Sequence, residues 1–330
     1  MLLDSLLPHI FLLLMAVAVF MYALLDGFDL GVGILLPADH PDYRQKMIAS
    51  IGPFWDANET WLVLAVGILL IAFPKAHNII LKEFYLPVLV LLVGLILRGV
   101  AFDFRAKSLS QFKPWWDKAF TLGSWMATAS QGYMLGIYVM GFQYHTLSIL
   151  FALLSAICVS AAYAYIGGAW LVLKTEHDLQ QFAVKRTRIA GYFTMAGITT
   201  VCLVNPLINP QVAERWFASS WLSLIPLACF VLILGVDYYL KKIHQFSQQL
   251  CWIPFVCIGT LFLLCLVGLA YSFYPYIIPF QLLANEAVGS VASLRFIFYG
   301  VVIVLPLILA YTLFSYWVFK GKSTQLNYYS

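Results

Sequence analysis

Charged side chains are scarce in this chain of 330 residues, where Asp, Glu, Lys and Arg make up 10% and hydrophobic residues 62%. Soluble domains carry about 25% charged residues and about 45–50% apolar ones. A chain with so few polar side chains cannot cover its own surface in water, which excludes a soluble globular protein. The formal net charge is only +4, and the basic residues occur in short clusters, so nucleic acid is excluded as a main partner.

The residues that most often bind metals and haem are few and unfavourably placed. The six cysteines form no CxxC pair and no cluster with histidine, so neither a zinc site nor a disulfide framework is indicated. The six histidines lie in loops or near the ends of apolar runs. A haem held in a helix bundle needs His or Met from facing helices, so we expect no haem ligated by this chain alone. The sequence also lacks a glycine-rich phosphate loop, a catalytic triad and an HExxH motif, and we therefore name no catalytic residue and no metal ligand.

Long apolar runs are what the chain has in abundance. A membrane-spanning helix needs about 20 mostly apolar residues, and nine runs meet this requirement. The loops between them are short, so we expect one transmembrane domain over 1–330, all α-helical, with approximate halves 1–140 and 147–271 and a last helix at 294–318. The predicted spans are 6–25 (helical on to residue 36), 54–73, 79–102, 119–140, 147–173, 189–207, 221–240, 252–271 and 294–318.

The loops on the two sides differ in their content of Lys and Arg. Fourteen of these residues follow the first, third, fifth, seventh and ninth spans, and four lie on the opposite side, with Arg98 set aside because it falls within a span. Cytoplasmic loops of membrane proteins carry the excess of positive charge. The N-terminus is therefore predicted to lie outside and the C-terminus in the cytoplasm, which agrees with an odd number of spans.

Six ionisable residues fall inside or at the ends of the first three spans. Such groups cost about 2.5–3.5 kcal/mol to insert and usually face a protein interior or water. With the orientation above, all six lie at the cytoplasmic ends of their spans, where we expect four acids to converge on one buried base. They are Asp26 and Asp29, Asp56 and Glu59, each pair spaced by three residues on one helix face, and Arg98 and Asp103.

This cluster has two interpretations. It is either an ion-pair cluster that fixes the packing of three helices, or a hydrated proton-conducting path from the cytoplasm. Neighbouring carboxylates disfavour one another's ionisation and a nearby arginine favours it, which keeps protons exchangeable. Arg98 stays protonated and cannot relay protons, so its role would be to set the local field.

Composition alone leaves a transporter, a channel and a respiratory subunit open. A proton-coupled secondary transporter, the main alternative, places its charges near the membrane midplane at broken helices. Here the charges lie at one edge, and no pair of spans is interrupted by Gly and Pro in corresponding positions. A purely structural scaffold stays open as a third alternative.

Three strings favour the respiratory subunit. The sequences DGFDLGVG at 26–33, WDANETWL at 55–62 and RGVAFDFR at 98–105 resemble, in order and spacing, subunit II of cytochrome bd-type quinol oxidases. The second string is most similar to the cyanide-insensitive branch of that family. Shorter similarities at 168–188, 274–279 and 306–317 extend the resemblance to nearly the whole chain.

The resemblance implies two four-helix bundles plus one peripheral helix in the bacterial cytoplasmic (inner) membrane. It implies a heterodimer with a haem-bearing subunit I, in which quinol is oxidised and dioxygen is reduced to water. Haem b and haem d would be ligated by subunit I, and subunit II would support assembly and contribute to proton delivery. The resemblance leaves open whether a quinone binds to this chain and whether small accessory subunits are present.

On this basis we assign candidate roles to nine residues. The acids Asp26, Asp29 and Asp56 match the family's acidic positions, with Arg98 beside them, and Asp29 and Asp56 are the expected start of proton uptake. The proton-path candidates are Asp26, Asp29, Asp56 and Glu59, and the charge partners or structural neighbours are Arg98, Asp103, Trp55, Asn58 and Trp61.

Overall fold

The computed structural model describes residues 2–218, 224–245 and 248–323, and most of these residues are α-helical. Within these ranges, nine helices contain 18 residues or more. They are α1 (Leu2–Ile34), α3 (Trp55–Ala72), α4 (Pro74–Lys107), α5 (Lys113–Val139), α6 (Thr146–Lys174), α7 (His177–Ile208), α9 (Leu224–Lys241), α10 (Ile253–Phe273) and α12 (Val291–Val318).

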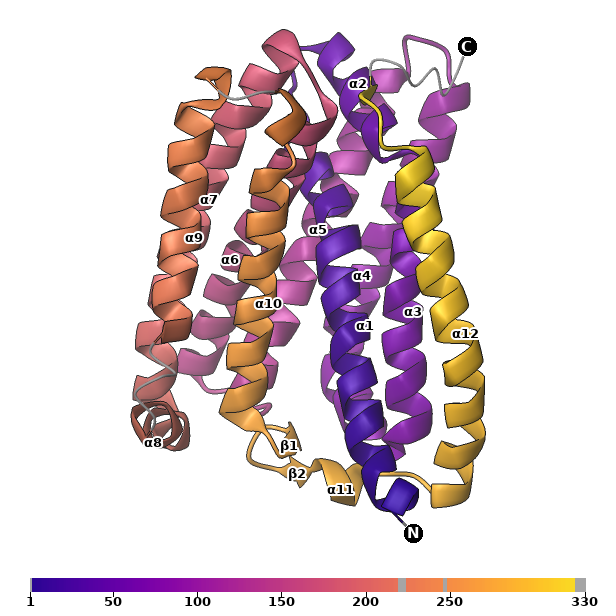
Figure 1. Cartoon of the computed structure of the whole chain (residues 1–330), viewed down its shortest axis with the longest axis vertical. Coiled ribbons are helices and arrows are strands. Elements are labelled where there is room, and N and C mark those ends of the chain that lie inside the picture. Colours follow the sequence, from indigo (N-terminus) through magenta and orange to yellow (C-terminus); the bar gives the residue numbers. More distant parts are fainter. Residues whose placement is uncertain (1, 219–223, 246–247, 324–330) are drawn as a thin grey trace.

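Short elements connect the long helices at both ends of the bundle (Figure 1). Several helices begin with proline in the first turn, where its missing N–H costs nothing. The short elements are α2 (Pro41–Ile51), α8 (Pro210–Ala218), α11 (Ala284–Ala287), two 3₁₀ turns at Ile243–Gln245 and Gln248–Leu250, and the antiparallel strands β1 (Tyr276–Ile278) and β2 (Leu282–Leu283).

Each predicted span coincides with one long helix. Eight of these helices are long and apolar enough to cross a membrane, and α5 is the exception in composition. Its polar side chains, among them Thr128 and Gln131, lower its hydropathy, and these two form hydrogen bonds with neighbouring helices. The first three residues of the predicted span 221–240 lie outside the described residues.

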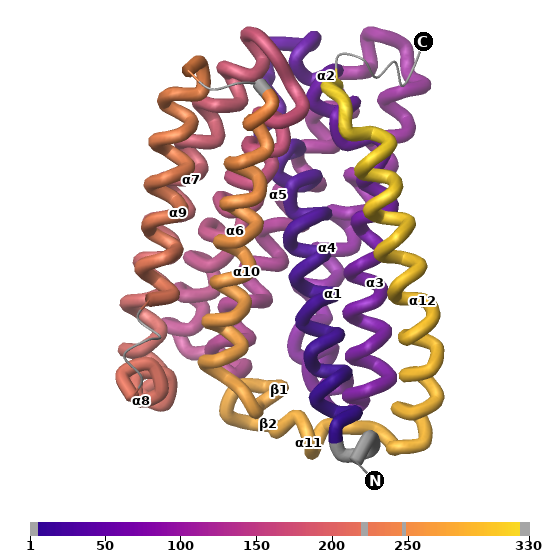
Figure 2. The backbone as a smooth tube through the Cα atoms, viewed as in Figure 1, coloured from indigo at the N-terminus to yellow at the C-terminus, as the bar shows by residue number. Residues whose placement is uncertain are grey.

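The long helices pack as two sets of four. The helices α1, α3, α4 and α5 form one set, and α6, α7, α9 and α10 form the other, with extensive contacts of α1 and α5 on α6 between them (Figure 2). The ninth, α12, lies at the edge against α1 and α3, and Leu294 is its one buried residue. The helix α1 begins at one end of the bundle and α12 ends at the other (Figure 1). The end of the bundle that carries α2 and the last turn of α12 is called the α2 end below.

Glycines bring α1 and α6 into backbone contact near the α2 end. A Cβ atom added to Gly31 would lie 1.8 Å from the carbonyl oxygen of Tyr163 and 3.0 Å from the Cα atom of Gly167. Small residues permit such close approach between membrane helices. This contact fixes the rotation of α1 and so decides which of its side chains point inward.

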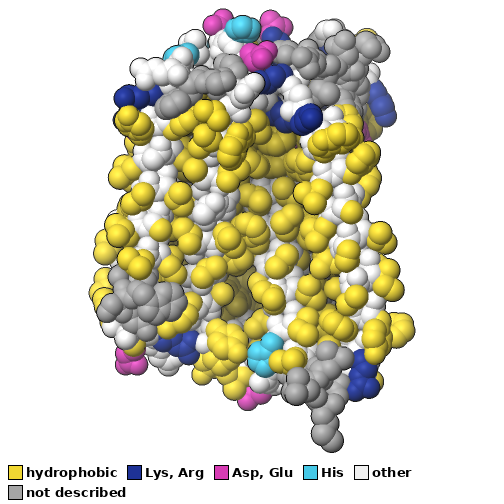
Figure 3. Space-filling view, viewed as in Figure 1, with side chains coloured by type: hydrophobic (Ala, Val, Ile, Leu, Met, Phe, Trp, Pro, Cys, Tyr) yellow, Lys and Arg dark blue, Asp and Glu magenta, His cyan; other side chains and the backbone are white. Residues whose placement is uncertain are grey.

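The outer surface is apolar between two polar ends. Figure 3 shows hydrophobic side chains along the helices, with most Lys, Arg, Asp and Glu side chains gathered at the two ends. At the α2 end, Asp117 on α5 forms an ion pair with Arg44 on α2, at 2.7 Å, and accepts a hydrogen bond from Arg105 on α4. Three elements distant in sequence are therefore joined there by one shared carboxylate.

Candidate functional site

The inner face of α1 carries two acids into the centre of the first set of helices. Asp26 and Asp29 are spaced by three residues, lie on one face of the helix and are both 0% exposed. The sequence-based expectation of a shared buried face is therefore correct for this pair. The helices α6, α3 and α5 pack against α1, and the Arg98 side chain of α4 contacts Asp26.

Arg98 is the base of the cluster and is 1% exposed. Its Nη2 atom donates to Asp26 Oδ1 at 2.7 Å and also to Glu59 Oε1. The Asp26 side chain is fully buried, whereas the Glu59 side chain is 27% exposed. The arginine of α4 therefore joins an inner acid on α1 to a more accessible acid on α3.

Asp29 is held differently. Asn58 Nδ2 donates to Asp29 Oδ2 at 2.7 Å and, more weakly, to the carbonyl oxygen of Leu25 at 3.4 Å. Among the described residues, Asp29 forms no ion pair. An isolated carboxylate is expensive to bury, whereas an amide hydrogen bond is available to either protonation state.

Several buried polar atoms of the cluster are left without a protein partner. Within the described residues these are Asp26 Oδ2, Asp29 Oδ1, and Arg98 Nε and Nη1. Buried polar groups are normally hydrogen-bonded to protein or to ordered water, and unmet ones are costly. The chemistry of this donor and acceptor set therefore suits internal water molecules between the acids.

Two predicted members do not join the cluster. Asp56 and Asp103 are exposed, and neither forms an ion pair within the part of the chain that the structure describes. The expectation that four acids converge on Arg98 is wrong. Asp26 and Glu59 contact Arg98 directly, whereas Asp29 is hydrogen-bonded to Asn58 instead. Asp56 lies outside the cluster. Each residue turns a helix by about 100°. Asp56 therefore lies about 160° from the buried Asn58, and Asp103 about 140° from Arg98.

The two tryptophans of the second motif have structural positions. Trp61 is buried one turn after Asn58, on the inner stripe of α3. Trp55 is partly buried, and its ring lies 5.0 Å from that of Phe102 on α4. Both pack α3 against its neighbours beside the acids.

A polar chain that the sequence did not single out continues from the acids into the bundle. Tyr22 lies one turn before Asp26 on α1, and its hydroxyl accepts from Gln131 Nε2 at 2.8 Å. Gln131 Oε1 in turn accepts from the hydroxyl of Tyr163 at 2.8 Å. These three side chains join α1, α5 and α6, and the spacing of Tyr22 from Asp26 was the available signal in the sequence.

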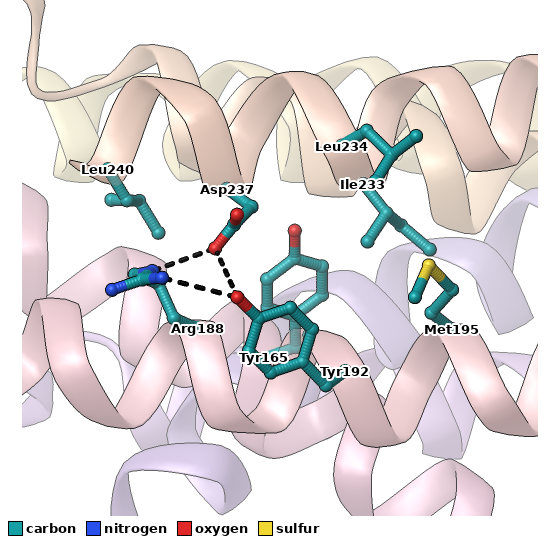
Figure 4. Close-up of a pocket in the computed structure, with 9 residues that line it drawn as sticks. Tyr165, Arg188, Tyr192, Met195, Ile233, Leu234, Asp237 and Leu240 are labelled. Carbon is teal, nitrogen blue, oxygen red and sulfur yellow. Dashed lines mark hydrogen bonds and ion pairs between the residues drawn. The ribbon is translucent and has the colours of Figure 1, made fainter. Parts of the chain in front are cut away.

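A second charged cluster lies apart, between α7 and α9 (Figure 4). Asp237 Oδ1 accepts from Arg188 Nε at 2.7 Å and from the hydroxyl of Tyr192 at 3.0 Å. Lys241 pairs with the other carboxylate oxygen at 2.6 Å. The cavity beside them measures about 10 Å³, which holds one water molecule at most. We interpret this cluster as a helix-packing contact.

An apolar groove of about 600 Å³ lies between α1, α3 and α12. Hydrophobic side chains form most of its wall, among them Leu14 on α1, Trp61 on α3 and Leu305 on α12. Such a groove suits an apolar chain rather than a polar substrate.

Comparison with known proteins identifies the family to which this architecture belongs. Residues 7–319 match the family described as cytochrome bd terminal oxidase subunit II. The chain belongs to that family. It is 27% identical over 363 residues to cytochrome bd-I ubiquinol oxidase subunit 2 of Escherichia coli K12, covering 97% of this chain and 96% of the relative. It is also 27% identical over 337 residues to cytochrome bd ubiquinol oxidase subunit 2 of Bacillus subtilis 168, covering 96% of each.

The fold agrees with this assignment. A chain in the structure of bd oxidase from Geobacillus thermodenitrificans superimposes with a TM-score of 0.74 at 18% identity, covering 93% of this chain and 98% of that chain. Family membership makes the protein a subunit of an oxidoreductase complex that contains haem, and it implies a partner subunit I. The sequence-based resemblance is thereby confirmed, and the transporter alternative is not supported.

Proposed function

We propose that this chain supports assembly of a haem-bearing subunit I and supplies a proton-uptake path from the cytoplasm for reduction of dioxygen to water. In this proposal nine helices span the bacterial cytoplasmic membrane, with the N-terminus outside and the α2 end in the cytoplasm. The excess of Lys and Arg in the loops at the α2 end supports this orientation.

The charge balance of the buried cluster carries the proposal. Three acids, Asp26, Asp29 and Glu59, surround a single base, Arg98, which contacts only two of them. If all three acids were ionised, the cluster would hold a surplus of negative charge in a buried site, which is strongly disfavoured. At least one acid is therefore suited to hold a proton, and Asp29 is the one without a basic partner among the described residues.

The order of exposure gives the path a direction. Asp56 is exposed at the start of α3, Glu59 one turn later is partly exposed, and Asp26 beyond Arg98 is fully buried. Tyr22, one turn before Asp26 on α1, and Gln131, which donates to its hydroxyl, continue the row of polar side chains toward the middle of the bundle. Protons would be collected at Asp56 and Glu59 and passed inward through water and the buried acids, while Arg98 sets the field.

The cofactors of the complex are assigned by the same proposal. Haem b and haem d, held by subunit I, would supply the oxygen chemistry. A quinone bound to this chain would place its isoprenoid tail in the apolar groove of α1, α3 and α12, whose walls near Leu14, Trp61 and Leu305 fit such a chain. The proposal makes no assignment of small accessory subunits.

The test is Asp29→Asn in the purified complex, assayed by quinol-driven oxygen uptake at matched haem content. Asparagine keeps the volume and the hydrogen bonds but cannot exchange a proton. We expect turnover to fall about ten-fold or more, because positioned proton transfer contributes about 10²–10⁴ to rates. Asp56→Asn should cause a smaller loss, because an exposed acid is more readily replaced by water.

The matched control is Asp237→Asn, which neutralises an acid in the helix-packing contact of α7 and α9. It should leave turnover per haem unchanged. Unchanged turnover of Asp29→Asn across the neutral pH range would contradict the proton path and leave the cluster as a packing device.

A further inference from the structure

The outlying helix α12 reaches the acid cluster at its cytoplasmic end. Along most of its length it is exposed, and Leu294 at the other end is its one buried residue. Near the α2 end, however, the ring of Tyr316 stacks on Phe54 with centroids 4.4 Å apart. It also meets Phe28 on α1 and Trp170 on α6 edge-on, at 6.4 and 6.1 Å. Three elements thus fix the orientation of this one tyrosine.

Two lysines secure the same end of α12. Lys174, in the last turn of α6, donates to the carbonyl oxygens of Phe319 at 2.5 Å and Gly321 at 3.2 Å. Lys322 donates in the opposite direction, to the carbonyl oxygens of Leu173 at 2.9 Å and Thr175 at 3.2 Å. Carbonyls at a helix C-terminus lack intrahelical partners and accept such bonds. Each lysine therefore caps the other helix, and the position of Tyr316 along α12 is set.

From this position Tyr316 acts on Asp29 through one intermediate. Its hydroxyl donates to Asn58 Oδ1 at 3.1 Å. Asn58 Nδ2, at the other end of the amide, donates to Asp29 Oδ2 at 2.7 Å. As long as Asn58 Oδ1 is engaged by a donor, its N–H group is directed at the carboxylate.

We propose that Tyr316 is a positioning residue for Asp29, and that the Tyr316–Asn58–Asp29 series lets this acid gain or lose a proton while Asn58 stays hydrogen-bonded to both Asp29 and Tyr316. This inference rests on the proposed proton path. A tyrosine hydroxyl both donates and accepts, whereas an amide presents a donor at one end and an acceptor at the other. The series can therefore run in either direction.

The two directions correspond to the two states of the acid. With Asp29 ionised, the Tyr316 hydroxyl donates to Asn58 Oδ1 and the Asn58 amide N–H donates to the carboxylate, as observed. With Asp29 protonated, the amide turns over, so that the carboxyl O–H donates to Oδ1 and the amide N–H donates to the Tyr316 oxygen. When Asp29 passes its proton to a water molecule between the buried acids, the carboxylate is restored and the amide returns to its first orientation.

Other ionisable groups lie around the series and influence the charge state of Asp29. Asp26 lies on the same helix, Glu59 on α3 and Arg98 on α4, and all three interact electrostatically with Asp29. None of them contacts Asn58 by a hydrogen bond among the described residues, where the amide oxygen accepts from Tyr316 on α12 and the amide nitrogen donates to Asp29 and, more weakly, to the Leu25 carbonyl oxygen on α1. This separates the role of Tyr316 from that of Arg98.

The experiment is a double-mutant cycle in the purified complex at matched haem content, with Tyr316→Phe in the wild-type and Asp29→Asn backgrounds. In the wild-type background we expect maximal oxygen uptake to fall about five-fold, the effect of one buried hydrogen bond, with the KM for quinol unchanged. In the Asp29→Asn background the same change should have no further effect. Tyr311→Phe, which removes a hydroxyl from an exposed position (66%) on the same helix, is the matched control and should match wild type.

The outcomes separate this inference from the proposed function. If Asp29→Asn slows turnover but Tyr316→Phe behaves like Tyr311→Phe, the positioning role is wrong and the proton path stands. If Tyr316→Phe lowers turnover equally in both backgrounds, its role is structural and the inference fails. If Asp29→Asn itself leaves turnover unchanged, the proposed path fails and the inference with it. Asn58→Ala serves as a second background, in which Tyr316→Phe should again add nothing.

Discussion

Replacing Arg98 with alanine is expected to damage assembly of the complex more than any single neutralisation of an acid in the cluster. Arg98 is 1% exposed and contacts the fully buried Asp26 at 2.7 Å. Removing one partner of a buried ion pair leaves an uncompensated charge and typically costs about 3–5 kcal/mol. Since each 1.4 kcal/mol is about a factor of ten, the folded population should fall about 10²-fold to 10³-fold or more relative to the unfolded one.

The assay is the amount of this chain in membranes, together with haem content and the melting temperature of the purified complex. Arg105→Ala is the matched control on the same helix. Its partner Asp117 keeps Arg44 at 2.7 Å, so no carboxylate is left alone and the loss should be much smaller. The double variant Arg98→Ala, Asp26→Asn removes both charges and should recover part of the stability.

The refuting results are specific. Wild-type membrane levels and melting temperature for Arg98→Ala would show that the cluster does not depend on its base. A double variant no better than Arg98→Ala would show that the cost is lost volume rather than uncompensated charge.

Two further predictions concern packing and cofactors. Gly31→Ala should destabilise the complex strongly, because the added Cβ meets the Tyr163 backbone oxygen at 1.8 Å and α1 must move away from α6. Gly67→Ala should be tolerated, because no atom lies within 4 Å of the added Cβ. Equal melting temperatures for the two variants would contradict this reasoning. The chain expressed without its partner should show no stoichiometric Soret absorption, since its histidines lie in loops or near span ends; a one-to-one haem band in the isolated chain would overturn that expectation.

The positions of the membrane helices could be predicted from the sequence because lipid imposes a local rule. A spanning segment must be apolar over about 20 residues and must satisfy its backbone hydrogen bonds within itself. Each helix therefore corresponds to one continuous apolar run in the sequence. The pair Asp26 and Asp29 was also predictable, since residues three apart share a helix face. The helix α5 was found by the same rule, although its polar side chains lower its hydropathy.

The membership of the site depended on rotations and contacts that no local rule fixes. Asp56 and Glu59 have the same spacing as Asp26 and Asp29, yet Asp56 is exposed, because packing directs Asn58 rather than Asp56 toward α1. Tyr316 meets Asn58 from 258 residues away in the chain, so its role exists only once α12 lies against α1 and α3. Hydropathy identifies which segments enter the membrane, but the face that each helix turns inward is decided by close packing against partners distant in sequence.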